Sequence, residues 1–210
     1  GPRSRVPLQR PPATSLVSSR LPHSSPARIE VAEIEVPALR VSFTGDLGWE
    51  LHCRAEDQLR LYEALIEAGR EFGAGPVGSR ALMSLRIEKG YGSWSREYSP
   101  EYWPQEVGLA RLCKMQKDFL NKQPAQEVMK NPAREELVLL HLDEADVAAS
   151  NADATGGEPI VRAGKGIGRV TSGAYGYSVG MSLALGFVRD AAPGDRGEVM
   201  GLGRSHKATI

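Results

Sequence analysis

Hydrophobic and polar residues alternate near the start of the chain, and a period of two is typical of strands that are buried on one face. Ile29 and Val31 share one parity, whereas Ile34 and Val36 share the other. This change of parity predicts a turn or bulge at Ala32-Glu33.

A second alternating pattern surrounds the short segment TGDLG, residues 44–48. Its apolar positions are Leu39, Val41 and Phe43 before the segment, and Trp49, Leu51 and Cys53 after it. The pattern predicts two strands, ALRVSF and WELHC, joined by a loop with Asp46 at its tip.

The apolar spacing then changes to that of helices. Residues 56–75 predict an amphipathic helix with an acidic start and glycines at its end. Its expected apolar stripe consists of Leu59, Tyr62, Leu65, Ile66 and Gly69. A second helix is expected over residues 79–89, ending at Gly90.

From about residue 134 onward the sequence shows short apolar runs separated by glycine turns. Residues 136–142 predict a strand, residues 158–173 predict a hairpin that turns near residues 163–165, and SLALGFV and EVMGLG predict further strands. We therefore expect an α+β chain, with an α+β unit in residues 1–125 and a small antiparallel β-barrel in residues 134–210.

Composition and charge exclude several function classes. The chain is 41% hydrophobic and 25% charged, as in ordinary globular proteins. Its 26 basic and 26 acidic residues give no electrostatic footprint for a nucleic acid or an anionic membrane. No apolar run approaches the roughly 18 residues that span a bilayer.

The proline-rich residues 1–27 disfavour a helix and lack the apolar core of a secretory signal. Because the chain begins without Met, we expect it to be truncated.

The cysteines and histidines do not indicate a metal site. Cys53 and Cys113 are too few for a disulfide framework, and we expect both as small buried hydrophobes in a reducing compartment. The four histidines lack HxxH spacing, and no CxxC occurs.

Three segments carry candidate chemistry. GKGIG, residues 164–168, lacks the spacing of a phosphate loop and is expected to be a hairpin turn. In SLRIEKGYGSW, residues 84–94, a solvated charged face accounts for Arg86 and Lys89, whereas Tyr91 and Trp94 either form a ligand wall or pack on a neighbour.

Asp46 has two interpretations. It is a turn former, or it is a fixed carboxylate that accepts two hydrogen bonds from adjacent N–H and NH₂ donors. A 2-amino-4-oxopteridine and a guanine both present such an edge, so the spacing leaves the ligand open.

Four segments, in this order, resemble the folate-binding region of the glycine-cleavage T-protein (aminomethyltransferase) family. They are FTGDLGWEL, SLRIEKGYGSW, PQEVGLARLCK and GRVTSGAYGYSVGMSLALGFV. The resemblance covers nearly the whole chain and is closest to the C-terminal part of dimethylglycine dehydrogenase and sarcosine dehydrogenase. The RNA-modifying folate branch is disfavoured, because its cysteine after Lys-Gly is absent from KGYGSW.

The resemblance implies a partial T-protein-like folate domain in residues 1–125, followed by the C-terminal barrel. It also implies a tetrahydrofolate site that captures a one-carbon unit as 5,10-methylenetetrahydrofolate, without a catalytic side chain or metal in this chain. Asp46 would take the place of the family's pterin-binding Glu, which is longer by one C–C bond, ~1.5 Å. By the same analogy Arg80 and Tyr91 would lie near the folate, and Trp94 and Glu106 would shape the pocket.

The family's fold includes an upstream half that is not found here, and no GxGxxG flavin fingerprint occurs in the chain. FAD is therefore expected only in an upstream oxidoreductase domain or partner chain, and the isolated chain is expected neither to oxidise an amine nor to turn over folate. The implied compartment is the bacterial cytoplasm or the mitochondrial matrix. A noncatalytic regulatory or scaffolding homologue that keeps the fold is the alternative.

Overall fold

A computed structural model of the chain describes residues 26–143 and 153–210. The chain divides into two compact units, Gly1–Leu82 and Met83–Ile210. The expectation for the proline-rich start, residues 1–27, falls almost wholly outside the described residues.

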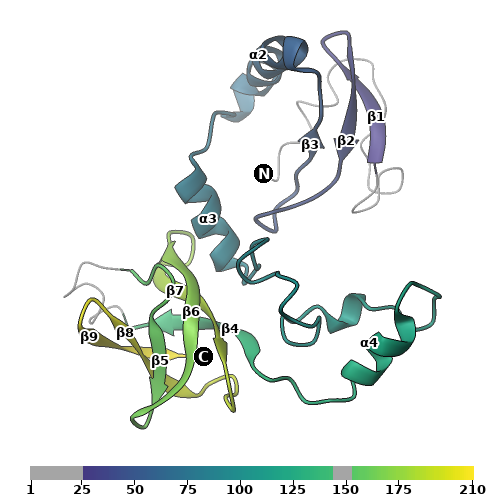
Figure 1. Ribbon diagram of the computed structural model, residues 1–210. Coiled ribbons are helices and arrows are strands. Elements are labelled where there is room, and N and C mark those ends of the chain that lie inside the picture. Colours follow the sequence, from purple (N-terminus) through teal and green to yellow (C-terminus); the bar gives the residue numbers. More distant parts are fainter. Residues whose placement is uncertain (1–25, 144–152) are drawn as a thin grey trace. The chain divides into compact units, whose positions relative to one another are not determined.

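The first unit contains a three-stranded antiparallel sheet in the order β1-β2-β3 (Figure 1). Its strands are β1 (Pro26–Val31), β2 (Ile34–Leu39) and β3 (Glu50–Leu51). Ala32 and Glu33 connect β1 to β2 with φ angles of 51° and 62°. Two central residues with positive φ are typical of a type I′ hairpin, so the predicted turn is confirmed.

One face of this sheet forms the core of the unit. The β1–β2 register places Ile29 opposite Val36 and Val31 opposite Ile34, and these four side chains pack with Leu61 in one cluster. Leu61 comes from α2 (Gln58–Gly69), which lies between the 3₁₀ helices η1 (Ala55–Asp57) and η2 (Arg70–Phe72).

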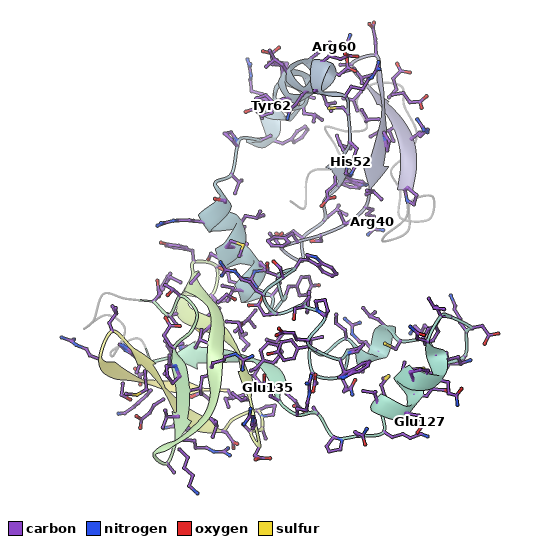
Figure 2. The ribbon with its side chains drawn as sticks, viewed as in Figure 1. Arg40, His52, Arg60, Tyr62, Glu127 and Glu135 are labelled. Carbon is purple, nitrogen blue, oxygen red and sulfur yellow. The ribbon has the colours of Figure 1, made fainter. Side chains whose placement is uncertain are left out.

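The predicted helix is present, but its predicted apolar stripe is partly wrong. The buried side of α2 carries Leu61 and Gly69, with Leu65 packed against the core, whereas Leu59 and Tyr62 are exposed. Tyr62 is labelled in Figure 2. Both sets fit a period of 3.6 residues, so periodicity alone does not select between the two neighbouring stripes.

The strands expected on either side of Asp46 are shorter than predicted. β2 ends at Leu39, and β3 comprises only Glu50 and Leu51. The Val41 N–H donates to the Leu39 carbonyl over 3.1 Å, a γ-turn contact of the kind that commonly ends strands. The loop that carries Asp46 therefore spans residues 40–49.

The second predicted helix is confirmed as α3 (Ser79–Glu88). Gly90, at a φ of 65°, follows the helix end, where glycine is favoured because it adopts the left-handed conformation without strain. Two short helices come later in the chain, η3 (Ala110–Leu112) and α4 (Lys122–Val128).

The predicted antiparallel barrel is confirmed. Six strands close into a barrel in the order β4-β7-β6-β5-β8-β9 (Figure 1). They are β4 (Glu136–Leu142), β5 (Pro159–Arg162), β6 (Lys165–Gly176), β7 (Met181–Val188), β8 (Arg196–Gly201) and β9 (Arg204–Thr209). GKGIG belongs to the β5–β6 hairpin, whose turn residues Ala163 and Gly164 have positive φ, so its interpretation as a hairpin is also confirmed.

Strand β7 is buried from Ser182 to Val188 without alternation. Ala184 and Val188 belong to the barrel core, whereas Leu183 and Leu185 form a second cluster with Ile87 from α3. A strand that is covered on both faces reads as a continuous apolar run, and SLALGFV is such a run.

Candidate functional site

The aromatic loop, residues 90–98, follows α3 and carries two of the predicted site residues. Tyr91 is 43% exposed and Trp94 is 81% exposed. Backbone hydrogen bonds fold the loop, from the Tyr98 N–H to the Ser93 carbonyl and from the Ser95 N–H to the Tyr98 carbonyl. The aromatic rings are thus presented by a folded loop.

Beneath this loop lies a fully buried ion pair. Arg86 Nη1 lies 3.2 Å from Glu97 Oε2, and both side chains have 0% exposure. Burial lowers the pKa of the Arg86 guanidinium from its ordinary value. Burial also acts to raise the pKa of Glu97, but hydrogen bonds from Ser172, Ser93 and Thr171 outweigh it and hold that pKa below its usual range. The hydrogen bonds to Glu97 thus favour its ionised form opposite the guanidinium.

The expectation that Arg86 belongs to a solvated charged face is wrong. Its side chain points into the interior, where Nη1 also donates to the Tyr91 carbonyl over 2.8 Å and Nη2 donates to Ser172 Oγ over 3.0 Å. A local sequence window contains neither Glu97 nor Ser172, so it does not reveal the partners that make burial of Arg86 tolerable.

Glu106 is also buried, with 2% exposure. Its carboxylate accepts two hydrogen bonds from Arg134, Nε to Oε1 at 2.8 Å and Nη2 to Oε2 at 2.7 Å. It also accepts backbone N–H groups of Trp103 and Arg134. The hydrogen bonds from Arg134 lower the pKa of Glu106 to about 2. These contacts suit a residue that shapes a wall, and a direct role in ligand binding stays a prediction.

A third charged cluster lies at the beginning of β4, where Glu135 is labelled in Figure 2. Glu135 Oε1 accepts the Tyr102 hydroxyl at 2.9 Å and pairs with Arg169 Nη1 at 3.1 Å. The Tyr102 ring stacks on Phe187, with centroids 3.8 Å apart. Burial and the hydrogen bond to Glu135 raise the pKa of Tyr102. This cluster attaches the segment after the aromatic loop to the barrel.

The other two predicted site residues lie in the first unit. Asp46 is half-buried in the loop of residues 40–49, and Arg80 is exposed in the first turn of α3. The five predicted residues are thus divided between the two units, and their assembly into one site stays a prediction.

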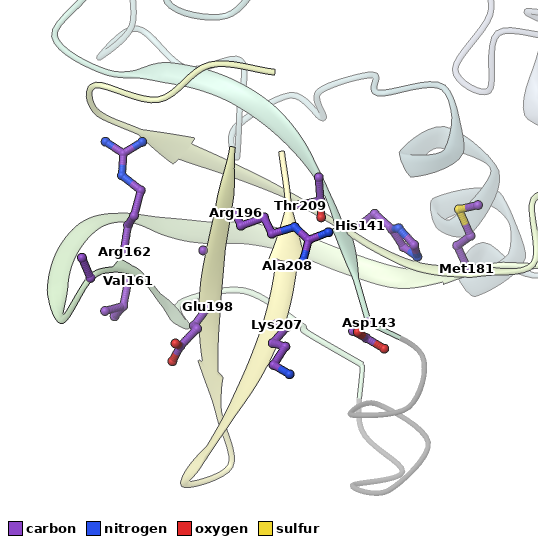
Figure 3. A pocket seen from close by; sticks show the side chains of 12 residues that line it. His141, Asp143, Val161, Arg162, Met181, Arg196, Glu198, Lys207, Ala208 and Thr209 are labelled. Carbon is purple, nitrogen blue, oxygen red and sulfur yellow. The ribbon is translucent and has the colours of Figure 1, made fainter. Parts of the chain in front are cut away.

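The barrel carries a pocket of about 670 Å³ that none of the five predicted residues lines. Figure 3 shows side chains from β4, β5, β7, β8 and β9 around it. The strand register places Thr209 beside both Arg196 and His141, and Lys207 beside Glu198. Acidic and basic side chains are mixed around this pocket, so its charge does not identify a ligand.

The described residues offer few other candidates for chemistry. Across residues 26–143 and 153–210, no group of three or more His, Cys, Asp or Glu side chains could hold a metal ion. Cys53 and Cys113 are free thiols and half-buried, so they are less buried than the small buried hydrophobes that we expected. No helix in the described part of the chain is long and apolar enough to cross a bilayer.

Comparison with known families identifies both halves of the fold. The family model described as the GCVT N-terminal domain matches residues 1–117. The model described as the glycine cleavage T-protein C-terminal barrel domain matches residues 136–210. The chain belongs to the glycine cleavage T-protein family.

Curated members of the glycine cleavage T-protein family match the chain over its full length. Mitochondrial dimethylglycine dehydrogenase of Mus musculus is 36% identical over 214 residues, which cover 100% of this chain and 24% of that protein. An aminomethyltransferase of Symbiobacterium thermophilum is 32% identical over 216 residues, covering 100% of this chain and 56% of that enzyme. The chain thus spans only part of these relatives.

The T-protein fold is also seen in a solved structure. The crystal structure of the glycine cleavage system aminomethyltransferase T from Bartonella henselae matches with a TM-score of 0.70 and 22% sequence identity, covering 83% of this chain and 48% of that one. At this identity the likeness supports the fold alone.

Sequence reasoning on this T-protein family member missed Arg86, Glu97 and Ser172. The continuous apolar run of β7 was the one sequence signal that other elements cover the outer face of this strand, because a strand with apolar residues on both faces must be buried on both. The chain segment from α3 to Val107 is the part that holds Arg86 and Glu97, and it supplies Ile87 to that outer cluster.

Proposed function

We propose that this chain is the tetrahydrofolate-binding module of a one-carbon-transferring enzyme, with 5,10-methylenetetrahydrofolate as the product. The observation that carries the proposal is the aromatic loop, which exposes Tyr91 and Trp94 although Arg86 and Glu97 tie it to the barrel. Flat aromatic faces that stay in water on a folded loop suit a planar ligand. The full-length similarity to dimethylglycine dehydrogenase and aminomethyltransferase supports the same assignment.

The proposed roles follow from the chemistry of each side chain. The Asp46 carboxylate would accept the adjacent N–H and NH₂ donors of the pterin. The exposed Arg80 guanidinium would pair with a carboxylate of the folate, and Tyr91 and Trp94 would border the ring. When bound, tetrahydrofolate supplies the nitrogen atoms that take up the one-carbon unit. The residues of this chain bind and orient it, so rate enhancement would come from positioning.

The source of the one-carbon unit belongs to the larger assembly in this proposal. Because the chain spans 24% of the mouse dehydrogenase, we assign amine oxidation to an upstream FAD domain or a partner chain. Both mitochondrial and bacterial proteins are among the relatives, in line with a mitochondrial matrix or bacterial cytoplasmic location.

One observation favours a second candidate, a regulatory or scaffolding homologue without the activity. Asp46 is shorter than Glu by one C–C bond, ~1.5 Å, and a carboxylate that does not reach the pterin would leave two ligand donors unpaired. Unpaired buried donors cost about 1–3 kcal/mol each. The two candidates therefore differ in folate affinity.

Thermal unfolding with added tetrahydrofolate tests the proposal. A ligand that binds only the folded chain at 100 times its Kd stabilises it by about 2.7 kcal/mol, so the melting temperature should rise with ligand concentration. Asp46→Ala should abolish this rise, whereas Asp57→Ala, which removes an aspartate paired with the nearby Arg60, should keep it. A wild-type melting temperature that does not respond to folate would favour the noncatalytic homologue.

Alanine substitution of the four remaining predicted residues tests the individual assignments. Alanine at residue 80, 91 or 94 should weaken tetrahydrofolate binding, because it removes the side chain of Arg80, Tyr91 or Trp94. Glu106→Ala should also weaken binding, because the wall that Glu106 shapes would change. Titration by fluorescence or calorimetry gives the dissociation constants. Unchanged affinity in all four variants would reject the assignments.

A further inference from the structure

The buried Arg86–Glu97 pair is a costly feature that stability alone does not explain. Both side chains have 0% exposure. Removing two charges from water costs several kcal/mol, and apolar residues of similar volume often stabilise such positions equally well or better. A contribution that apolar side chains could not make is therefore expected from this pair.

The hydrogen bonds on one side of the pair hold the backbone of the aromatic loop. Arg86 Nη1 donates to the Tyr91 carbonyl over 2.8 Å. Glu97 Oε2 accepts the Ser93 N–H at 2.7 Å. These bonds fix the main chain at one aromatic residue, Tyr91, and directly before the other, Trp94.

The hydrogen bonds on the other side reach the barrel. Glu97 Oε1 accepts Thr171 Oγ1 at 2.7 Å and Ser172 Oγ at 2.6 Å, and Arg86 Nη2 donates to Ser172 Oγ over 3.0 Å. The buried pair therefore attaches the aromatic loop to β6.

The local irregularity of β6 makes this attachment possible. In a regular strand, consecutive side chains point to opposite faces, yet Thr171 and Ser172 both bond to one oxygen atom. The β6–β7 register shifts between Val170 and Ser172, and such a bulge redirects a side chain. The two hydroxyl groups converge on Glu97 at the bulge.

The loop is also packed tightly against itself. A Cβ atom on Gly92 would lie 2.5 Å from Tyr98 Cε1 and 2.9 Å from the Cβ of Glu97. Within the loop, Trp94 and Tyr98 form an isolated backbone bridge. Trp94 nevertheless keeps 81% of its surface exposed, so the ordering of the backbone does not serve to bury this ring.

We infer that Arg86 and Glu97 are positioning residues, which hold the aromatic loop in its ligand-ready shape so that Tyr91 and Trp94 form a wall before any ligand arrives. A preformed wall spares the ligand the entropy cost of ordering the loop, and this raises affinity without a direct contact. The identity of the ligand, the pterin ring of tetrahydrofolate, rests on the proposed function. The ordering of the loop by Arg86 and Glu97 does not depend on that proposed function.

Glu97→Gln in the full chain tests the inference. The amide nitrogen would replace an acceptor with a donor that faces other donors, and the charge opposite Arg86 would be lost. Hydrogen exchange of the loop amides, followed by mass spectrometry, should accelerate at least about 10-fold, while β7 amides keep their protection. The dissociation constant for tetrahydrofolate should rise about 10-fold.

Glu135→Gln is the matched control, since it neutralises another buried carboxylate, one that pairs with Arg169. It should leave loop exchange and folate affinity within twofold of wild type. Ser172→Ala, which removes one hydroxyl of the attachment, should accelerate loop exchange in the same direction as Glu97→Gln and provides a second test if that variant does not fold.

The two readouts separate the inference from the proposed function. The inference is supported if Glu97→Gln both accelerates hydrogen exchange in the loop and weakens tetrahydrofolate binding, while Glu135→Gln changes neither. Loop exchange that stays at the wild-type rate in both Glu97→Gln and Ser172→Ala overturns it, as does loosening of the loop without loss of folate affinity. If the wild-type chain does not bind tetrahydrofolate, the proposed function and the positioning role for that ligand both fail, whatever the exchange rates.

Discussion

Three carboxylates of this chain show how surroundings decide the behaviour of one functional group. Glu97 has no exposed surface and binds one arginine and two hydroxyl groups. Glu106 is 2% exposed, and its partner Arg134 is 62% exposed. Asp46 is half-buried in a long loop. Only the first two carboxylates are fixed by several charged or backbone donors, and they connect segments distant in sequence.

At the residue scale, Glu106 predicts a specific loss of stability in acid. A folded-state pKa of about 2, lowered by hydrogen bonds from Arg134, lies below the unfolded value near 4.5. The stabilisation is therefore complete above about pH 4.5 and is lost as the pH falls towards about 2. The shift corresponds to roughly 3 kcal/mol, but screening of the exposed Arg134 reduces the expected contribution to about 1–2 kcal/mol.

Urea unfolding of wild type and Glu106→Gln between pH 2 and pH 7 measures this contribution. The variant should be less stable at pH 7, and most of the difference should be lost by pH 2, where Glu106 is half protonated in the folded chain and almost fully protonated in the unfolded chain. Glu136→Gln, which changes an exposed glutamate of β4, is the control and should leave the stability at pH 7 close to that of wild type. A difference between wild type and Glu106→Gln that is constant over the whole range would contradict the assigned pKa.

At the element scale, local signals predicted most of the fold and long-range contacts decided the rest. The turns at Ala32-Glu33 and Ala163-Gly164 were predictable, because a change of parity and a glycine can both be recognised from neighbouring residues in the sequence. The end of β2 and the buried face of α2 were not, since each depends on which surface packs against the core. Arg86 was misassigned for the same reason, because its partners come from the aromatic loop and β6.

The close approach of β6 and β7 gives a prediction for one glycine. A Cβ atom at Gly168 would overlap the carbonyl oxygen of Phe187 in the neighbouring strand. Gly168→Ala should therefore destabilise the chain by at least about 2 kcal/mol, because backbone atoms must move. Gly166, two residues earlier in the same strand, has no atom within 4 Å of such a Cβ.

Thermal denaturation of Gly168→Ala and Gly166→Ala makes the comparison. The second variant should match wild type or be slightly more stable, since alanine reduces the entropy of the unfolded chain. Equal effects of the two substitutions would show that strand propensity, and not the approach of β7, explains the glycine at residue 168.

At the scale of the whole molecule, the structured barrel unit extends well beyond the barrel strands. Ile87 packs with Leu183 and Leu185, Tyr102 stacks on Phe187, and the Leu137 N–H donates to the Glu106 carbonyl over 2.7 Å. The expected boundary at residue 134 would remove all of these contacts from the outer face of β7 and the beginning of β4. The compact unit that contains the barrel begins at Met83.

Two fragments therefore should differ in stability, 83–210 and 134–210. The longer fragment keeps the buried Ile87 and the partly buried Tyr102 over β7. Full burial of an apolar side chain contributes about 1.5–3 kcal/mol, so the longer fragment should be more stable by roughly 3 kcal/mol in urea unfolding followed by circular dichroism. Leu120→Ala in the longer fragment is the control, because Leu120 is 90% exposed and its loss should have little effect. Fragments of equal stability would mean that the barrel is self-sufficient and that the segment from α3 to Val107 contributes only the shape of the aromatic loop.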